Sequence, residues 1–309
     1  MAYGDGMPAP PDPADPAVRA ARERLRSLSP AQRSALVRLA AARSGAGPAA
    51  EVETLRPGDG PPLVLVHPVG GELFCYSALV AALGGTFPVL GLDAGALLRG
   101  PSRPTVQDVA RSYATRLDGT GAATVAGWSF GAVLAFEIAR LVTPDRTVVA
   151  IDSLPAGAGS SVGLRSTDVE LRVGFAEELA RSAPLADDVV RLAWDADDAA
   201  FVAAAAAALD TSGLGPDESD LAARLTIHRN AAAALERHRS SPGGPAVRVV
   251  WALDTATELL EPWRRVSGGE VDGCGIVADH WSLLRAPAVH DVARVLQEVH
   301  QQNTKGSPA

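Results

Sequence analysis

Cysteine and long hydrophobic runs are both scarce in this sequence. Its 309 residues include two cysteines, Cys75 and Cys274, which are too few for a disulfide framework or, by themselves, for a metal cluster. We expect both to be free thiols in a reducing cytoplasm. No apolar run approaches the length that spans a bilayer, and the N-terminus lacks the cationic start and apolar stretch of a signal peptide. The sequence therefore predicts a soluble cytoplasmic protein with no metal site.

Positive charge is also in short supply. The chain has 28 Lys and Arg residues against 36 Asp and Glu residues, a net charge of −8. A broad nucleic-acid surface needs a basic footprint, so this charge balance argues against nucleic acid as a partner. The 47% hydrophobic and 21% charged residues are ordinary for a soluble globular protein. The length permits a full core, in one large α/β domain or two smaller ones.

The most informative stretch is 123–141, where a short β-like run enters G-W-S-F-G and continues as an Ala-rich helical pattern. A strand that turns into a helix through G-x-S-x-G is the nucleophile elbow of α/β hydrolases. The glycines leave room for a sharp turn that exposes the Ser129 hydroxyl at a helix N-terminus, where negative charge is favoured. The alternative is a chance pentapeptide in a glycine-rich chain. The strand before it and the helix after it favour the elbow.

Further strands are expected at 63–66, 87–92, 147–151, 246–253 and 270–277, with helices between them. This alternation predicts an α/β-hydrolase fold, a mostly parallel central sheet with helices on both faces. In 155–244 a Gly/Ser/Ala loop at 155–163 precedes helical patterns at 168–181, 187–209 and 218–239. We expect this stretch to be a helical lid over the active site. The core then comprises 48–154 and 245–302. Residues 1–16 are expected to be disordered, 17–47 to form a helical linker or docking element, and 303–309 to fray.

A serine nucleophile needs a base, usually a histidine oriented by a carboxylate. In this fold the chain order is serine, acid, histidine, and His280 is the histidine that follows the final strand. His67 precedes the nucleophile and is expected to be structural, while His228 and His238 are expected on a solvated helix face. Two acids stand at strand ends, Asp152 after the strand that follows the elbow and Asp254 after the next. Spacing alone leaves these two undecided.

The loop after the strand at 63–66 reads H-P-V-G-G. In α/β hydrolases this loop supplies one oxyanion-hole amide and the residue after the nucleophile supplies the other. The amides of Val69 and Phe130 are therefore the expected donors. The alternative for the glycine pair is an ordinary tight turn.

Three segments together, H-P-V-G-G-E-L-F-C-Y, G-W-S-F-G-A-V-L-A-F-E-I-A and A-D-H-W-S-L-L-R-A-P, resemble the thioesterase domains that end nonribosomal peptide synthetases and polyketide synthases. The similarity covers about residue 52 to the C-terminus. It implies a catalytic triad of Ser129, Asp152 and His280. Asp254 remains the alternative acid, because related stand-alone editing thioesterases place their acid later.

The resemblance also implies a function. A serine thioesterase of this family releases an acyl or peptidyl chain from the phosphopantetheine of a carrier protein, by hydrolysis or macrocyclisation, and needs no cofactor of its own. The expected partners are the carrier protein or synthase module and the acyl thioester, with no membrane. The helices at 17–47 resemble linkers between modules, yet no carrier domain precedes them; the initial Met favours a discrete protein over an excised domain. The rivals are a stand-alone editing thioesterase, a general carboxylesterase and an idle docking module.

Overall fold

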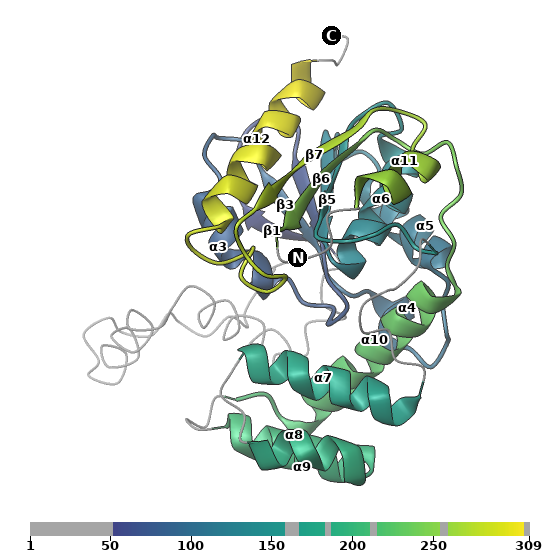
Figure 1. The fold of residues 1–309 in the computed structure, drawn as a ribbon, viewed down its shortest axis with the longest axis vertical. Coiled ribbons are helices and arrows are strands. Elements are labelled where there is room, and N and C mark those ends of the chain that lie inside the picture. Colours follow the sequence, from purple (N-terminus) through teal and green to yellow (C-terminus); the bar gives the residue numbers. More distant parts are fainter. Residues whose placement is uncertain (1–51, 158–166, 183–186, 211–214, 254–258, 306–309) are drawn as a thin grey trace, which may run out of the picture. The chain divides into compact units, whose positions relative to one another are not determined.

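The computed structural model describes residues 52–157, 167–182, 187–210, 215–253 and 259–305 (Figure 1). The segments expected to be disordered at 1–16 and helical at 17–47 lie outside these ranges, and so does Asp254.

A seven-stranded sheet forms the centre of the described chain. Its strands are β1 (Val52–Arg56), β2 (Leu63–Val66), β3 (Val89–Leu92), β4 (Thr124–Trp128), β5 (Val148–Ile151), β6 (Val247–Ala252) and β7 (Val271–Ile276). The spatial order is β1-β3-β2-β4-β5-β6-β7. Strand β1 pairs antiparallel with β3 and every other pair is parallel. This confirms the expected mostly parallel sheet, with β1 as an edge strand that the sequence analysis did not anticipate.

Helices cover both faces of the sheet because its inner strands are apolar on both sides. Strand β2 (L-V-L-V) and strand β5 (V-V-A-I) are buried along their whole length, as expected of parallel strands between two helical layers. Leu63 and Leu65 pack with α3 (Ser77–Ala82) and α12 (Val289–Lys305). Val64 and Val66 pack on the other face with α5 (Val106–Leu117), α6 (Phe130–Val142) and α11 (Leu260–Val266) (Figure 1).

Local sequence signals set the helix boundaries. The Thr105 side chain caps α5 by accepting a hydrogen bond from the Asp108 amide, and the Asp108 carboxylate accepts one from the Thr105 amide. The buried positions of this helix follow a period of 3.6 residues: Val106, Val109, Ala110, Tyr113 and Leu117. Two short helical elements, the 3₁₀ turn η1 (Phe74–Tyr76) and α4 (Ala96–Arg99), lie in the connections that follow β2 and β3.

The C-terminal helix is longer than predicted. Helix α12 continues to Lys305, so the frayed tail expected from residue 303 is wrong for residues 303–305. Asn303 is buried, and its side-chain amide donates hydrogen bonds to Thr124 Oγ1 at 3.0 Å and to the Thr147 carbonyl at 2.9 Å. Asn303 therefore joins the end of α12 to Thr124 of β4 and to Thr147, which precedes β5, and these bonds keep the helix ordered past its apolar stripe.

Between β5 and β6 the described residues form four helices, α7 (Asp168–Ser182), α8 (Asp187–Asp195), α9 (Asp198–Leu209) and α10 (Glu218–Arg237). We call this part of residues 155–244 the helical insertion. It has an apolar cluster of its own, which includes Phe175, Phe201 and Leu225. The single helix predicted at 187–209 is interrupted before α9, because the Asp197 side chain accepts a hydrogen bond from the Ala200 amide and starts a new helix.

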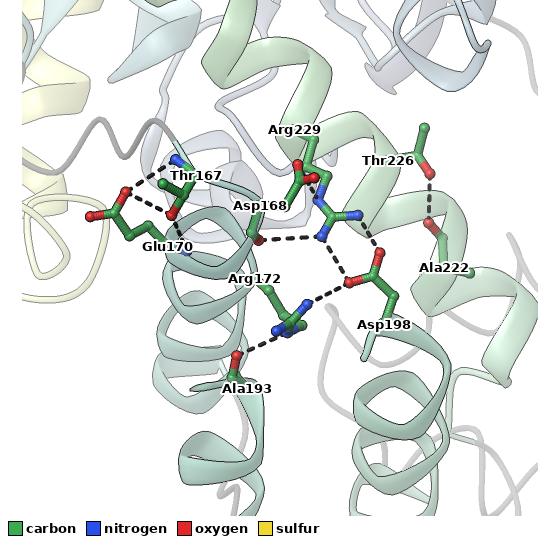
Figure 2. Close-up of polar contacts among 9 residues, drawn as sticks. All are labelled: Thr167, Asp168, Glu170, Arg172, Ala193, Asp198, Ala222, Thr226 and Arg229. Atoms are coloured by element: carbon green, nitrogen blue, oxygen red, sulfur yellow. Dashed lines mark hydrogen bonds and ion pairs between the residues drawn. The ribbon is translucent and has the colours of Figure 1, made fainter. Parts of the chain in front are cut away.

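An ion cluster joins the helices of the insertion (Figure 2). The Asp198 carboxylate on α9 accepts hydrogen bonds from Arg172 of α7 and from Arg229 of α10, each at 2.8 Å. Arg172 also donates to the Ala193 carbonyl of α8 at 2.9 Å. The Arg229 guanidinium, followed by that of Arg172, lowers the pKa of Asp198 against the opposing effect of burial. Four helices are therefore held by two arginines and one carboxylate.

The expectation that His228 and His238 lie on a solvated face is wrong, since both are buried. His238 Nε2 lies 3.1 Å from Glu137 Oε1 of α6, and His228 Nδ1 lies 3.2 Å from Glu178 Oε2 of α7. Their neighbours in sequence are polar, but their partners in space come from distant helices. Trp194 of α8 is half exposed.

Candidate active site

The G-W-S-F-G segment forms the sharp turn between β4 and α6. Ser129 has φ 57° and ψ −125°, a strained conformation for a residue with a side chain. Its amide donates to the Ile151 carbonyl at 3.0 Å. A Cβ on Gly127 would collide with the Gly131 carbonyl, and a Cβ on Gly131 would collide with the Val66 carbonyl. Both glycines are required because the backbones of β2, β4 and α6 meet here.

Asp152 and His280 are in contact. His280 Nδ1 donates to Asp152 Oδ2 at 2.6 Å, and Asp152 Oδ1 accepts a hydrogen bond from the Ala252 amide at 2.9 Å. The Asp152 side chain is fully buried, whereas that of His280 is 30% exposed. A buried carboxylate on Nδ1 fixes the tautomer of the imidazole and leaves Nε2 to act as a base.

Aromatic side chains flank the His280 ring. Trp128, the residue before Ser129, lies with its ring centroid 4.8 Å away at 32°, and Trp281 lies 5.2 Å away at 88°. Within the described residues no hydrogen bond joins the Ser129 hydroxyl to His280, and bonds of this kind are often long before substrate binds. Trp128 links the two residues, because it directly precedes Ser129 in the chain and its ring lies against the His280 ring.

Asp279 has a different role from Asp152. Its Oδ1 accepts hydrogen bonds from the Trp281 and Ser282 amides, each at 2.8 Å, and these bonds hold its pKa below the ordinary value. Asp279 therefore shapes the loop that carries His280.

The loop after β2 lies against the start of α6. Val66 and Gly127 are register partners on neighbouring parallel strands, so both following loops emerge at one sheet edge. A Cβ on Gly131 would also lie 2.7 Å from the His67 carbonyl. Val69 is half-buried in this loop, and Phe130 is the first residue of α6, whose first amides have no partner within the helix.

His67 is structural, as expected. It is fully buried, with Nδ1 2.6 Å from the Pro68 carbonyl and Nε2 2.8 Å from the Tyr113 hydroxyl. Burial lowers its pKa to about 4, against the raising effect of the Pro68 carbonyl. The imidazole is therefore neutral near pH 7 and serves as a hydrogen-bonding brace.

Sequence reasoning missed Tyr76. Its hydroxyl donates to the Val66 carbonyl at 2.7 Å and accepts from the Trp128 amide at 2.9 Å. This hydroxyl joins the ends of β2 and β4, where the two loops begin. The only signal was its place at the end of the H-P-V-G-G-E-L-F-C-Y segment.

The sheet order, the strained serine turn after β4 and the Asp–His pair after β5 and β7 define an α/β-hydrolase fold. The profile of the family described as "Thioesterase domain" matches residues 61–299, and the chain belongs to this family of hydrolases.

Curated relatives are nonribosomal peptide synthetases. The synthetase btyA of Aspergillus terreus is 37% identical over 101 residues, which are 31% of this chain and 11% of the relative. The probable non-canonical synthetase CymA of Salinispora arenicola is 26% identical over 255 residues, 77% of this chain and 3% of the relative. The chain thus spans about a tenth or less of the length of the curated relatives it matches.

Solved structures share the fold. The Vlm2 thioesterase domain superposes with a TM-score of 0.59 at 22% identity, covering 81% of this chain and 98% of that domain. A four-domain nonribosomal peptide synthetase gives a TM-score of 0.67 at 23% identity, covering 83% of this chain and 21% of the synthetase. In the part of the chain that the structure describes, no helix is long and apolar enough to cross a membrane.

Proposed function

We propose that this chain is a serine thioesterase that releases an acyl or peptidyl group from the phosphopantetheine arm of a carrier protein. The observation that carries the proposal is the 2.6 Å hydrogen bond between His280 Nδ1 and the buried Asp152 carboxylate. It orients an imidazole beside Trp128, the neighbour of the strained Ser129. Ser129 is the proposed nucleophile, His280 the base and Asp152 the orienting acid.

The reaction follows from these positions. His280 Nε2 takes the proton from the Ser129 hydroxyl, whose oxygen attacks the thioester carbonyl carbon. The amides of Val69 and Phe130 stabilise the resulting oxyanion; the loss of one such donor typically lowers the rate by about 10²–10³. Collapse breaks the carbon–sulfur bond, and His280 returns the proton to the phosphopantetheine thiolate. His280 then activates water, giving a free acid, or an internal amine or hydroxyl, giving a macrocycle.

The helical insertion is the proposed lid. It leaves the core after β5 and rejoins it before β6, so it starts next to Asp152 in the chain. A cover that excludes water would decide between hydrolysis and ring closure. Residues 17–47 are proposed as the linker or docking element. The carrier protein is proposed as partner because the curated relatives are nonribosomal peptide synthetases.

The test is intact-protein mass spectrometry with acyl-phosphopantetheine thioesters and simple esters. The wild type is expected to gain the acyl mass, Ser129→Ala to gain none, and Ser102→Ala, a change at an exposed serine, to behave as the wild type. The mass of the released product then shows whether the enzyme forms a free acid by hydrolysis or a macrocycle by ring closure. Faster turnover of simple esters than of thioesters would favour a carboxylesterase, and unchanged turnover in Ser129→Ala would refute the assignment.

A further inference from the structure

The glycine pair after β2 is packed against the helical insertion. Gly71 has φ +79°, and a Cβ there would lie 2.6 Å from Ile227 Cγ2 of α10. A Cβ on Gly70 would collide with the Glu178 carboxylate of α7. Both glycines are buried. The loop that contains Val69 is therefore bounded on one side by side chains of the insertion.

Glu178 is an unusual residue to place against this loop. Its side chain is 17% exposed, and its Oε2 lies 3.2 Å from His228 Nδ1 of α10. The His228 ring in turn lies against Phe175, with centroids 5.7 Å apart. Burying a carboxyl group removes its hydration and costs free energy, whereas an apolar side chain at this position would avoid that cost.

Arg181 makes a second contact from the same helix. Its guanidinium lies 4.4 Å from the centroid of the Trp281 ring, and its carbonyl accepts a hydrogen bond from Arg285 at 3.0 Å. Trp281 follows His280 and packs edge-on against it. Glu178 and Arg181 are three residues apart, so they lie on one face of α7, within its last turn and a half.

The last part of α7 thus touches both loops that carry the proposed site. Helix α10 is anchored to the core elsewhere, through hydrogen bonds from Asn230 to the Leu98 and Gly100 carbonyls at 2.9 and 3.0 Å. The contacts of Glu178 and Arg181 are therefore additional to those that attach the insertion.

We propose that Glu178 and Arg181 are positioning residues, which hold the loop after β2 and the loop after β7 in the arrangement that acyl transfer requires. This proposal rests on the roles given above to Val69 and His280. Glu178 holds the loop that carries the Val69 amide, and Arg181, through Trp281, holds the loop that carries His280. The insertion then contributes to the chemical step as well as covering it.

The test compares Glu178→Ala, Glu178→Gln and Arg181→Met in steady-state turnover of an acyl thioester. Because small displacements of reacting groups are costly, Glu178→Ala and Arg181→Met are each expected to lower kcat about tenfold with KM within about twofold. Glu178→Gln keeps the shape and is expected to lose less. Glu218→Ala and Arg191→Met, exposed residues of α10 and α8, are the matched controls.

Amide hydrogen exchange supplies a readout independent of activity. Peptides over 67–76 are expected to exchange faster in the Glu178 variants, and peptides over 278–285 in Arg181→Met, with the sheet unchanged. Faster exchange across all of α7–α10 in Glu178→Ala would indicate unfolding of the insertion. The kcat values of Glu178→Gln and Arg181→Met would then decide whether the positioning role holds.

Unchanged kcat, or a rise in KM alone, would overturn the positioning role. Full turnover in Ser129→Ala would refute the proposed function instead, whereas an inactive Ser129→Ala beside fully active Glu178 and Arg181 variants would refute only this proposal.

Discussion

Replacing Asp152 by Asn isolates the orienting role proposed for the carboxylate, because the amide has almost the same shape. Asp152 has φ 46°, and Asn is among the few residues that tolerate this left-handed region. The Ala252 amide donates to Asp152 Oδ1, so it holds the amide oxygen of Asn at that position. The NH₂ group then faces His280 Nδ1, which must accept a hydrogen bond. The neutral ring consequently carries its proton on Nε2, the atom that has to receive the proton of Ser129.

The expected loss follows from this reversal. Exchange of the orienting Asp for Asn in a serine triad lowers kcat by about 10⁴, equivalent to about 5 kcal/mol of transition-state stabilisation. Stopped-flow acylation with an acyl N-acetylcysteamine thioester measures it, and urea unfolding checks that the fold survives. Asp254→Asn is the parallel variant. The assignment of Asp152 would be refuted if Asp152→Asn kept more than a tenth of the wild-type acylation rate. If Asp254→Asn showed the large loss of rate instead, Asp254 would be the acid.

Two further predictions concern the elbow and its supporting loop. Gly131→Ala is expected to destabilise the fold by more than about 2 kcal/mol in urea unfolding, because the new Cβ would meet the Val66 carbonyl; a loss below about 0.5 kcal/mol would contradict the packing described. The pKa of His67, about 4 in the folded chain, lies below its ordinary value of about 6.5, so the unfolded chain binds the extra proton between these pH values. The stability contributed by neutral His67 is full above pH 6.5 and falls by about 1.4 kcal/mol per pH unit toward pH 4. His67→Gln does not titrate and should flatten this pH dependence of the free energy of unfolding. An identical slope in both proteins would show that His67 does not cause the pH dependence.

The sequence predicted the parts of the fold that depend on local pattern. The short apolar runs became parallel strands, and the glycines around Ser129 marked a turn that only glycine fits. Strand β1 was missed because its partner β3 is distant in the chain and its own sequence, V-E-T-L-R, is only half apolar. The break before α9 depends on one capping side chain inside an otherwise continuous helical pattern.

For the candidate site, the pattern could place Ser129 and His280 at strand ends but could not choose the acid. The contact between Asp152 and His280 joins residues 128 positions apart, and it depends on which strand ends converge. The burial of His228 and His238 was mispredicted for the same reason, since Glu178 and Glu137 approach them only in the folded chain. Tyr76 is a further case, because its hydroxyl acts on the backbone of two strands that no local pattern connects.

The separate apolar cluster of the insertion has a consequence for how such chains diversify. Because Phe175, Phe201 and Leu225 pack among the helices α7–α10 and not into the sheet, substitutions there can reshape the proposed lid without disturbing the packing beneath Ser129. An exchange of this segment between thioesterases of different substrates is therefore structurally feasible as one unit. The transplanted segment would have to retain Glu178, Arg181 and Ile227, which meet the host's two loops. It would also have to retain Asn230, whose side chain donates to the Leu98 and Gly100 carbonyls.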